Sequence, residues 1–303
     1  MRLVLFDDYR VGVVRGGSLD RVVDVSGAID PAPGSPPGLS MNRLIERWES
    51  LCGKVEALAR KGPDRPLAGV RLLPPVPNPS KILITGNYSS HIAEMRDQAR
   101  AWVKPGGELP REGIRYNLKS PSALIGPTDQ IMLPAELAQR RIDHEAELAF
   151  VVGRRAADVP PERAREHIFG YTVFLDISLR GNEPVSLRKS FDTFAVMGPW
   201  LVTADEIPDP QRLAIRLWRN GELRQDGGTW QMDYPVDDLL SFASTMLTLY
   251  PGDVFSTGTP AGVGGIADGD TLVAEVEQVG RLEVKVANRP SSRTPWLREL
   301  AQA

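Results

Sequence analysis

Three carboxylates in two β-rich segments have spacings that suit a metal ion. Glu145 and Glu147 are two residues apart in the segment Arg141–Gly153, and side chains with that spacing share one face of a strand. Like charges side by side repel each other unless a cation neutralises them. Asp176 lies in a second segment, among valine, phenylalanine, leucine and isoleucine, where we expect a buried carboxylate that needs a cation or several donors. Three carboxylates with no thiol favour Mg²⁺ or Mn²⁺ over zinc.

Interpretations without a metal stay open at this point. Glu145 and Glu147 also fit a solvated edge face of a strand. Asp176 can instead form an ordinary buried salt bridge with Arg180, which shares its strand face, or with Lys189. The residue types alone therefore predict either a site for a hard metal ion or a buried ion-pair network.

His91 and Glu94 form a second pair whose spacing suits chemistry. They stand at positions i and i+3, so on a helical turn their side chains share a face. A carboxylate placed in this way can hold an imidazole by one nitrogen while the other nitrogen acts as a general base. The alternative interpretation is a surface pair without a catalytic role.

Six segments, taken in order, resemble the fumarylacetoacetate hydrolase family. Their order and spacing match the family over roughly residues 81–288, in the branch of acylpyruvases and 2-hydroxyhepta-2,4-diene-1,7-dioate isomerases. The six segments are Gly86–Met95, Lys119–Gly126, Asp143–Leu148, Gly170–Arg180, Arg188–Phe194 and Gly252–Gly264.

The resemblance implies a fold, a metal and a substrate class. The expected fold is α+β and β-rich, with a mixed β-roll catalytic domain after a small α+β N-terminal domain, usually as a homodimer. The positions matching Glu145, Glu147 and Asp176 would hold Mg²⁺ or Mn²⁺, and the substrate would be a small 2-oxo or 2,4-dioxo acid. Family members hydrolyse the C–C bond of acylpyruvates, or decarboxylate or isomerise related acids.

The resemblance also implies roles for individual residues. His91 and Glu94 would be the catalytic dyad on a segment that orders over the substrate, and Lys189 would contact a substrate oxygen near the metal. Salt bridges from Lys189 to Asp192 or Asp176 are the alternative. The expected substrate-binding residues are Arg180, through a bidentate fork to a carboxylate, Thr259 in a tight glycine-rich turn, Glu183 and Lys119.

Two positions depart from the family pattern. Leu175 replaces the asparagine that commonly precedes the metal-binding aspartate, and Glu183 stands where hydrolase-like members often carry a glutamine that touches substrate. A carboxylate at position 183 would repel an anionic tail, although Arg188 could offset its charge. We therefore expect that the distal part of the substrate is not a simple dicarboxylate.

Hydrolysis of the C–C bond of a fumarylpyruvate- or acylpyruvate-type acid is the preferred functional hypothesis, because the His91–Glu94 pair is intact. The second hypothesis keeps the metal but predicts a decarboxylase or isomerase of oxaloacetate-like or 2-hydroxy-dienedioate acids. A third is a non-catalytic protein that binds small acids. Retention of the metal ligands, the dyad and Lys189 disfavours this third hypothesis.

The elements that must position these residues divide the chain in three. We expect a small N-terminal domain over residues 1–75, with strands and one helix near 41–60, and the catalytic domain over 80–290, followed by a tail over 291–303. Strands dominate the catalytic domain, with a hairpin at Asn220–Gly221. The polar segment Gln98–Arg115 is expected to form part of a lid.

Composition excludes several other classes of protein. The chain has 303 residues, 42% of them hydrophobic and 25% charged, as in ordinary soluble globular proteins. A formal net charge of −3 gives no reason to expect nucleic acid, and no apolar run is long enough to cross a bilayer. Cys52 is the single cysteine, so thiolate metal clusters and intrachain disulfides are impossible. We expect a cytoplasmic protein without a membrane partner.

Overall fold

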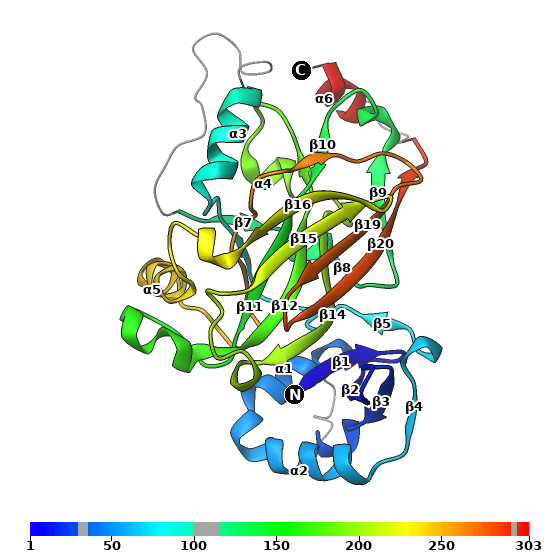
Figure 1. The fold of residues 1–303 in the computed structure, drawn as a ribbon, viewed down its shortest axis with the longest axis vertical. Helices are drawn as coiled ribbons and strands as arrows, with labels where there is room; N and C mark the ends of the chain where they lie inside the picture. The colour runs from blue at the N-terminus through cyan, green and yellow to red at the C-terminus, as the bar shows by residue number, and fades with distance from the viewer. Residues whose placement is uncertain (30–35, 100–114, 292–295, 303) are drawn as a thin grey trace.

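Three β-sheets form the framework of the described residues (Figure 1). The structure is a computed structural model, and it describes residues 1–29, 36–99, 115–291 and 296–302. Helices are few and lie at the periphery of the sheets in this view. The β-rich α+β fold class predicted from the sequence is confirmed.

Twelve strands form the largest sheet of the described residues. β1 joins β14 in antiparallel register, with Leu3 opposite Leu201, so strands of the first 75 residues continue the sheet that carries the carboxylates. The division of the chain into domains stays a prediction. The main path of this sheet runs β4 (Asp64–Pro66), β3 (Arg21–Asp24), β2 (Arg10–Arg15), β1 (Arg2–Phe6), β14 (Ala195–Thr203), β12 (Ile168–Asp176), β11 (Ala146–Val152), β17 (Val254–Ser256), β6 (Ile82–Ile84) and β7 (Asn117–Lys119), while β5 (Leu72–Leu73) pairs with β1 and β8 (Leu124–Ile125) with β14.

A five-stranded sheet shares a core with one face of the large sheet. Leu148 and Phe150 of β11 belong to this core together with Leu217 of the second sheet, whereas Ala149 and Val151 enter a separate core on the other face. The alternation predicted for β11 is therefore confirmed. The five strands, in order, are β16 (Glu222–Gly228), β15 (Ala214–Arg219), β19 (Thr271–Val276), β20 (Gly280–Arg289) and β9 (Gln130–Pro134).

The hairpin between β15 and β16 has the predicted turn. Asn220 and Gly221 both have positive φ, 53° and 81°, which is the conformation that a two-residue hairpin turn requires and that asparagine and glycine adopt most readily. This turn sets the register of β16, which carries a residue of the candidate site.

A small three-stranded sheet adjoins the carboxylates. It has the order β13 (Ser178–Leu179), β10 (Ile142–His144), β18 (Gly264–Gly265). The chain leaves this sheet at Glu145 and enters the large sheet at Ala146. The carbonyl oxygen of Glu145 accepts a hydrogen bond from the backbone amide of Asp176 at 2.9 Å, so the main chains of these two residues are joined directly.

Two helices replace the single helix predicted near residues 41–60, so that prediction was wrong. The chain leaves helical geometry at Arg47, with φ −107° and ψ 16°, and the ring of Trp48 then meets Phe169 edge-on at 5.2 Å between centroids. The apolar spacing continues across the bend, so the sequence pattern does not reveal it. The helices of the described residues are α1 (Ser40–Glu46), α2 (Trp48–Lys61), α3 (Ser89–Ala99), α4 (Val185–Arg188), α5 (Val236–Met246) and α6 (Trp296–Gln302).

The segment 291–303, expected as a tail, contains the helix α6, which packs against the 3₁₀ turn Ala135–Leu137. Leu300 and Ala301 of α6 contact the main core. Most of the segment expected as a lid, Gln98–Arg115, lies outside the described residues.

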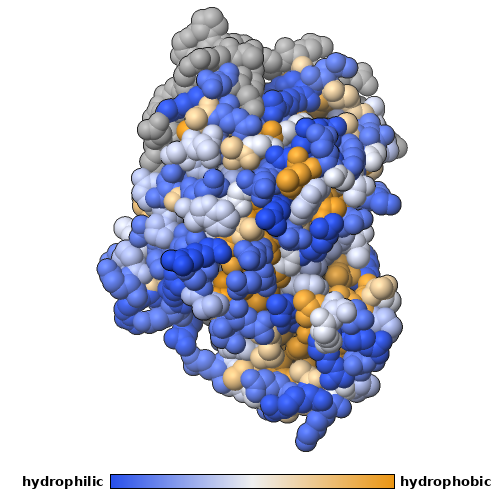
Figure 2. Space-filling view, viewed as in Figure 1, coloured by the Kyte–Doolittle hydropathy of each residue, from blue (hydrophilic) through white to orange (hydrophobic). Residues whose placement is uncertain are grey.

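Polar side chains cover most of the face shown in Figure 2, and apolar ones gather near its middle. Among the described residues, no helix is long and apolar enough to span a membrane.

Candidate active site

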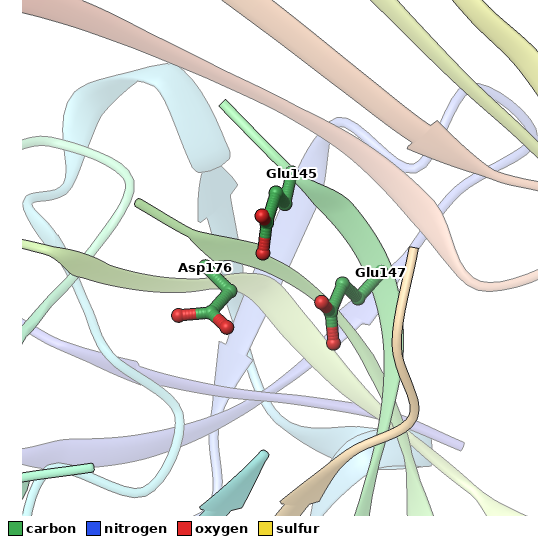
Figure 3. Close-up of side chains that lie close together, drawn as sticks. All are labelled: Glu145, Glu147 and Asp176. Carbon is green, nitrogen blue, oxygen red and sulfur yellow. The ribbon is translucent and has the colours of Figure 1, made fainter. Parts of the chain in front are cut away.

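The three predicted metal ligands converge on one buried point. Figure 3 shows the carboxylates of Glu145, Glu147 and Asp176 facing a common space, and one oxygen from each lies within 4.8 Å of the others. Their exposed fractions are 2%, 1% and 1%. The solvated edge face, one alternative for Glu145 and Glu147, is thereby excluded.

Two lysines pair with two carboxylates of the triad, Glu145 and Asp176. Lys189 Nζ donates to Glu145 Oε2 at 2.6 Å and to Asp176 Oδ2 at 2.5 Å. Lys119 Nζ donates to Asp176 Oδ1 at 2.5 Å and to the carbonyl oxygens of Phe194 and Ile177 at 2.6 and 3.3 Å. All three N–H donors of Lys119 are thus occupied, so here it supports Asp176 and has no donor free for the substrate contact that we expected.

Glu147 is the triad carboxylate that neither lysine contacts. Burial, followed by the negative charge of Asp176, raises the pKa of Glu147 to about 8. Glu145 behaves in the opposite way, because Lys189 and Arg180 outweigh its burial and hold its pKa well below the usual value. A divalent cation would supply the positive partner that Glu147 needs in order to ionise. An all-oxygen donor set suits Mg²⁺ or Mn²⁺. The residues present therefore fit such an ion.

Strand β17 and the turn after it fix the orientation of Glu147. Its Oε2 accepts hydrogen bonds from the Ser256 hydroxyl at 2.6 Å and from the Gly258 amide at 2.8 Å. The hydroxyl of Thr259, one residue further on, donates to the carbonyl oxygen of Ala146 at 2.7 Å. Because the hydroxyl proton is used in this bond, the expected contact with substrate would have to come from the backbone amide of Thr259.

Gln225 of β16 joins the ligand strand to this turn. Its Oε1 accepts from the Ala146 amide at 3.0 Å and lies 3.2 Å from His144 Nδ1, while its Nε2 donates to Thr259 Oγ1 at 2.7 Å and to the Pro260 carbonyl at 2.9 Å. The side chain is completely buried and uses its full capacity of hydrogen bonds. Because Ala146 separates Glu145 from Glu147, we call this arrangement the Gln225 clasp.

Arg180 is occupied by carboxylates of the protein. Its Nε donates to Asp143 Oδ2 at 2.7 Å and its Nη2 to Glu145 Oε1 at 2.6 Å, and a second arginine, Arg141, donates to Asp143 Oδ1 at 2.6 Å. The structure thus shows a charge-balancing role for Arg180, although its partners are Asp143 and Glu145 rather than the expected Asp176. Substrate binding by Arg180 stays a prediction.

The dyad residues lie on α3 above the ligands. His91 Nε2 is 3.8 Å from Glu145 Oε1, and His91 Nδ1 is 3.7 Å from Glu94 Oε2. Glu94 Oε2 also accepts from the Gly262 amide at 3.1 Å. Burial disfavours ionisation of Glu94, but His91 and the backbone amides outweigh it and lower the pKa of Glu94. A movement of less than about 1 Å would close a hydrogen bond from the imidazole to this carboxylate.

Glu183 lies in the loop between β13 and α4. Its charge partner is Arg140, which the sequence did not suggest. Arg140 Nη2 is 2.9 and 3.1 Å from its two carboxylate oxygens and 2.8 Å from the Arg180 carbonyl. Arg140 Nη1 also donates to the carbonyl oxygen of Leu300 in α6, at 2.7 Å. The expectation that Glu183 repels an anionic tail loses its basis, because the charge of Glu183 is balanced.

Sequence reasoning missed three residues of the site. Asp143 continues the alternation of Glu145 and Glu147, so its spacing was a usable signal. Gln225 gave none, because a buried amide on a hairpin strand resembles any polar strand residue. Tyr88 is fully buried, its hydroxyl has no partner among the described residues, and burial with the charges of Glu147 and Asp233 raises its pKa well above the usual value.

A groove of about 760 Å³ lies elsewhere, along the bend between α1 and α2. Its lining includes Trp48, Arg154 and Phe169. Phe169 is near the start of β12 and Asp176 is at its end, so the groove is roughly 25 Å from the triad at the usual rise of a strand. It is separate from the site described here.

Comparisons with known proteins agree with this geometry. The profile described as "Fumarylacetoacetate (FAA) hydrolase C-terminal" matches residues 81–287. A maleylpyruvate hydrolase of Aquipseudomonas alcaligenes is 38% identical over 94% of this chain and 99% of its own length. An oxaloacetate tautomerase of Xenopus laevis is 39% identical over 71% of this chain and 68% of its own length. The crystal structure of maleylpyruvate hydrolase from Sphingobium sp. SYK-6, in complex with manganese(II) and pyruvate, is 37% identical, with a TM-score of 0.83 and coverage of 96% and 100%.

The fold and the buried triad define a β-roll protein with a site for a divalent metal ion. The chain belongs to the fumarylacetoacetate hydrolase family. The resemblance on the six sequence segments is thereby confirmed.

Proposed function

We propose that this protein is a divalent-metal-dependent hydrolase that cleaves the C–C bond of an acylpyruvate-type 2,4-dioxo acid. The observation that carries this proposal is the convergence of the carboxylate triad, His91 and Lys189 at one buried point. The similarity to a maleylpyruvate hydrolase over nearly the whole chain supports the choice of reaction.

Glu145, Glu147 and Asp176 would hold the ion, which supplies Lewis acidity for the C1 carboxylate and C2 oxygen of the substrate. His91, held by Glu94, takes a proton from the water that attacks the C4 carbonyl. The bond between C3 and C4 then breaks, and its electron pair passes to the departing pyruvate as an enolate. The acyl group leaves as a carboxylic acid.

Lys189 stabilises the enolate, and the protonated His91 carries the proton that C3 of the departing pyruvate gains. Its Nζ already lies between Glu145 and Asp176, so it is within reach of a substrate oxygen placed at the triad. These carboxylates outweigh the burial of Lys189 and raise its pKa, which keeps the ammonium charged when negative charge develops.

Keto–enol tautomerisation of oxaloacetate-like acids, with decarboxylation as a related outcome, is the second candidate. It is favoured by the similarity to an oxaloacetate tautomerase over 71% of the chain. It uses the same ion and the same lysine but needs no attacking water, so the His91–Glu94 pair favours hydrolysis.

Product analysis tests both candidates. Purified protein is incubated with acetylpyruvate and with oxaloacetate in Mg²⁺, Mn²⁺ or EDTA. Pyruvate and acetate from acetylpyruvate, abolished by EDTA, support hydrolysis. Enol–keto exchange or CO₂ release confined to oxaloacetate would establish the second candidate and contradict the first.

The protein is further proposed to act as a cytoplasmic homodimer without nucleic acid or membrane partners. Two large hydrophobic side chains, Leu223 and Trp230, are 46% and 57% exposed in and just after β16, which supports burial against a second copy. Sedimentation equilibrium at micromolar concentration should give twice the monomer mass, and a monomer would contradict the proposal.

A further inference from the structure

Arg188 is a cation of the site that no carboxylate of the described residues pairs with. Its Nε donates to the carbonyl oxygen of Glu183 at 2.7 Å and its Nη1 to that of Leu179 at 3.2 Å. Carbonyl oxygens carry no full negative charge, so these bonds position the guanidinium without neutralising it.

The other cations around the triad each have an acidic partner. Lys119 pairs with Asp176, and Lys189 pairs with both Asp176 and Glu145. Arg180 and Arg140 pair with Asp143 and Glu183 respectively. Arg188 is therefore exceptional among these side chains.

Charge balance shows where a further anion fits. With Glu147 ionised, as binding of a divalent ion requires, four carboxylates (Asp143, Glu145, Glu147 and Asp176) lie among four cations (Arg141, Arg180, Lys119 and Lys189), so their formal charges cancel. A divalent ion adds two positive charges, which the C1 carboxylate and the enolate oxygen of an acylpyruvate would balance. The charge of Arg188 then remains for one more anionic group.

The position of Arg188 suits the acyl tail. It ends α4, and the next residue, Lys189, reaches two members of the triad. The Leu179 carbonyl that accepts from Arg188 Nη1 immediately precedes Arg180, whose Nη2 donates to Glu145 at 2.6 Å, so the guanidinium lies beside the residues of the site. Glu183, the carboxylate nearest in the loop, is already held by Arg140.

We propose that Arg188 binds a carboxylate at the distal end of the acyl tail, so that the preferred substrates are 2,4-dioxo acids with a second carboxylate. This inference rests on the proposed hydrolase function and assigns its specificity. It replaces the earlier expectation from Glu183 of a tail that is not a simple dicarboxylate.

Steady-state kinetics with two substrates of the same head group test the proposal. Maleylpyruvate has the distal carboxylate and acetylpyruvate lacks it. Arg188→Gln should lower kcat/KM for maleylpyruvate by about 10- to 100-fold, mainly through KM, because one charge-assisted hydrogen-bonded pair is lost. The value for acetylpyruvate should change by less than about twofold, and Arg188→Lys should recover part of the loss.

A second pair of variants tests the charge argument. Arg140→Gln leaves the charge of Glu183 unbalanced and should lower kcat/KM for maleylpyruvate but not for acetylpyruvate. The double variant Arg140→Gln with Glu183→Gln should restore kcat/KM for maleylpyruvate. The matched control is Arg154→Gln, which removes a surface arginine paired with Glu49. It should leave kcat/KM unchanged for both substrates.

The outcomes separate the two proposals. Equal losses on both substrates in Arg188→Gln would show a structural role for the arginine and overturn the subsite. An unchanged preference between the substrates would overturn it as well, while wild-type hydrolysis would keep the proposed function intact. If wild-type protein hydrolyses neither acid, the hydrolase function fails and the subsite fails with it.

Discussion

At the scale of single residues, two of the three triad carboxylates, Glu145 and Asp176, are paired with lysines before any ion binds. Without Lys189 and Lys119, the negative charges of Glu145 and Asp176 would depend more heavily on a bound metal ion for compensation. Breaking one partner of such a buried network leaves the other charge uncompensated, which is strongly destabilising. Variants of Glu145, Glu147 and Asp176 should therefore be assayed for both the free energy of unfolding and metal affinity.

Glu147 should make the metal-free protein less stable as pH rises. Its folded pKa of about 8 exceeds the ~4.3 of an unfolded glutamate, so between these values the folded state holds a proton that the unfolded state has lost. The free energy of unfolding in EDTA should fall by up to about 1.4 kcal/mol per pH unit from pH 5 to 8. Urea unfolding of wild type and Glu147→Gln measures this, and only the wild type should show the extra decline. Equal pH dependence in both proteins would contradict the raised pKa.

His91→Ala should separate metal binding from catalysis. The imidazole approaches Glu145 only at 3.8 Å, so Mn²⁺ affinity by calorimetry should stay within about threefold, while kcat for acylpyruvate hydrolysis should fall at least about 100-fold. His167→Gln, in the 3₁₀ segment Pro161–His167, is the control and should leave kcat unchanged. Full hydrolysis by His91→Ala would remove the dyad from the mechanism.

Period-two alternation is a property of the strand itself, so spacing placed Glu145 and Glu147 on one face, and the apolar surroundings of Asp176 indicated its burial. The family resemblance then assigned these three carboxylates to a metal ion rather than to an ion-pair network. The partners of Arg180 and Glu183 were not predictable in this way. Asp143 and Arg140 meet them only after β10, β13 and the loop that follows have come together. Ion pairs between distant segments depend on tertiary packing, which a single sequence does not encode at any fixed spacing.

At the scale of elements, the Gln225 clasp joins the hairpin strand β16 to β11 and to the turn after β17. Gln225→Met preserves length but removes four hydrogen-bond contacts of a buried amide. We expect the free energy of unfolding to fall by about 2–4 kcal/mol. Mn²⁺ affinity should also fall, by about tenfold, because supporting hydrogen bonds orient metal ligands.

Urea unfolding and calorimetry with Mn²⁺ measure the two effects of Gln225→Met separately. A loss of stability with unchanged Mn²⁺ affinity would show that the clasp only holds the fold together. The hairpin itself was predictable from Asn220–Gly221, since its turn needs two residues with positive φ. The bend at Arg47 was not, because the apolar pattern continues across it. The helix α6 does have apolar residues at helical spacing (Leu297, Leu300 and Ala301), so the sequence carried a signal for it.

At the scale of the whole molecule, the sheet passes without a break from β1 into β14. Leu3 is fully buried and lies opposite Leu201 in that junction. Leu3→Ala should lower the free energy of unfolding of the entire protein by about 2–4 kcal/mol, in one calorimetric transition. Leu58→Ala, on the half-exposed side of α2, should change it by less than about 0.5 kcal/mol. Two separate transitions, with only the first shifted, would show that the N-terminal part unfolds independently.

The bond from Arg140 to Leu300 places the C-terminal helix in contact with the loop that carries Glu183. The triad, in contrast, is built on β11, β12 and the residue before β11. If the loop with Glu183 and Arg188 selects the acyl tail as proposed, substitutions in α6 should shift that choice while leaving the chemistry at the metal untouched. A directed-evolution library restricted to residues 296–302 would measure how far substrate preference can diverge from the C-terminal end of the chain alone.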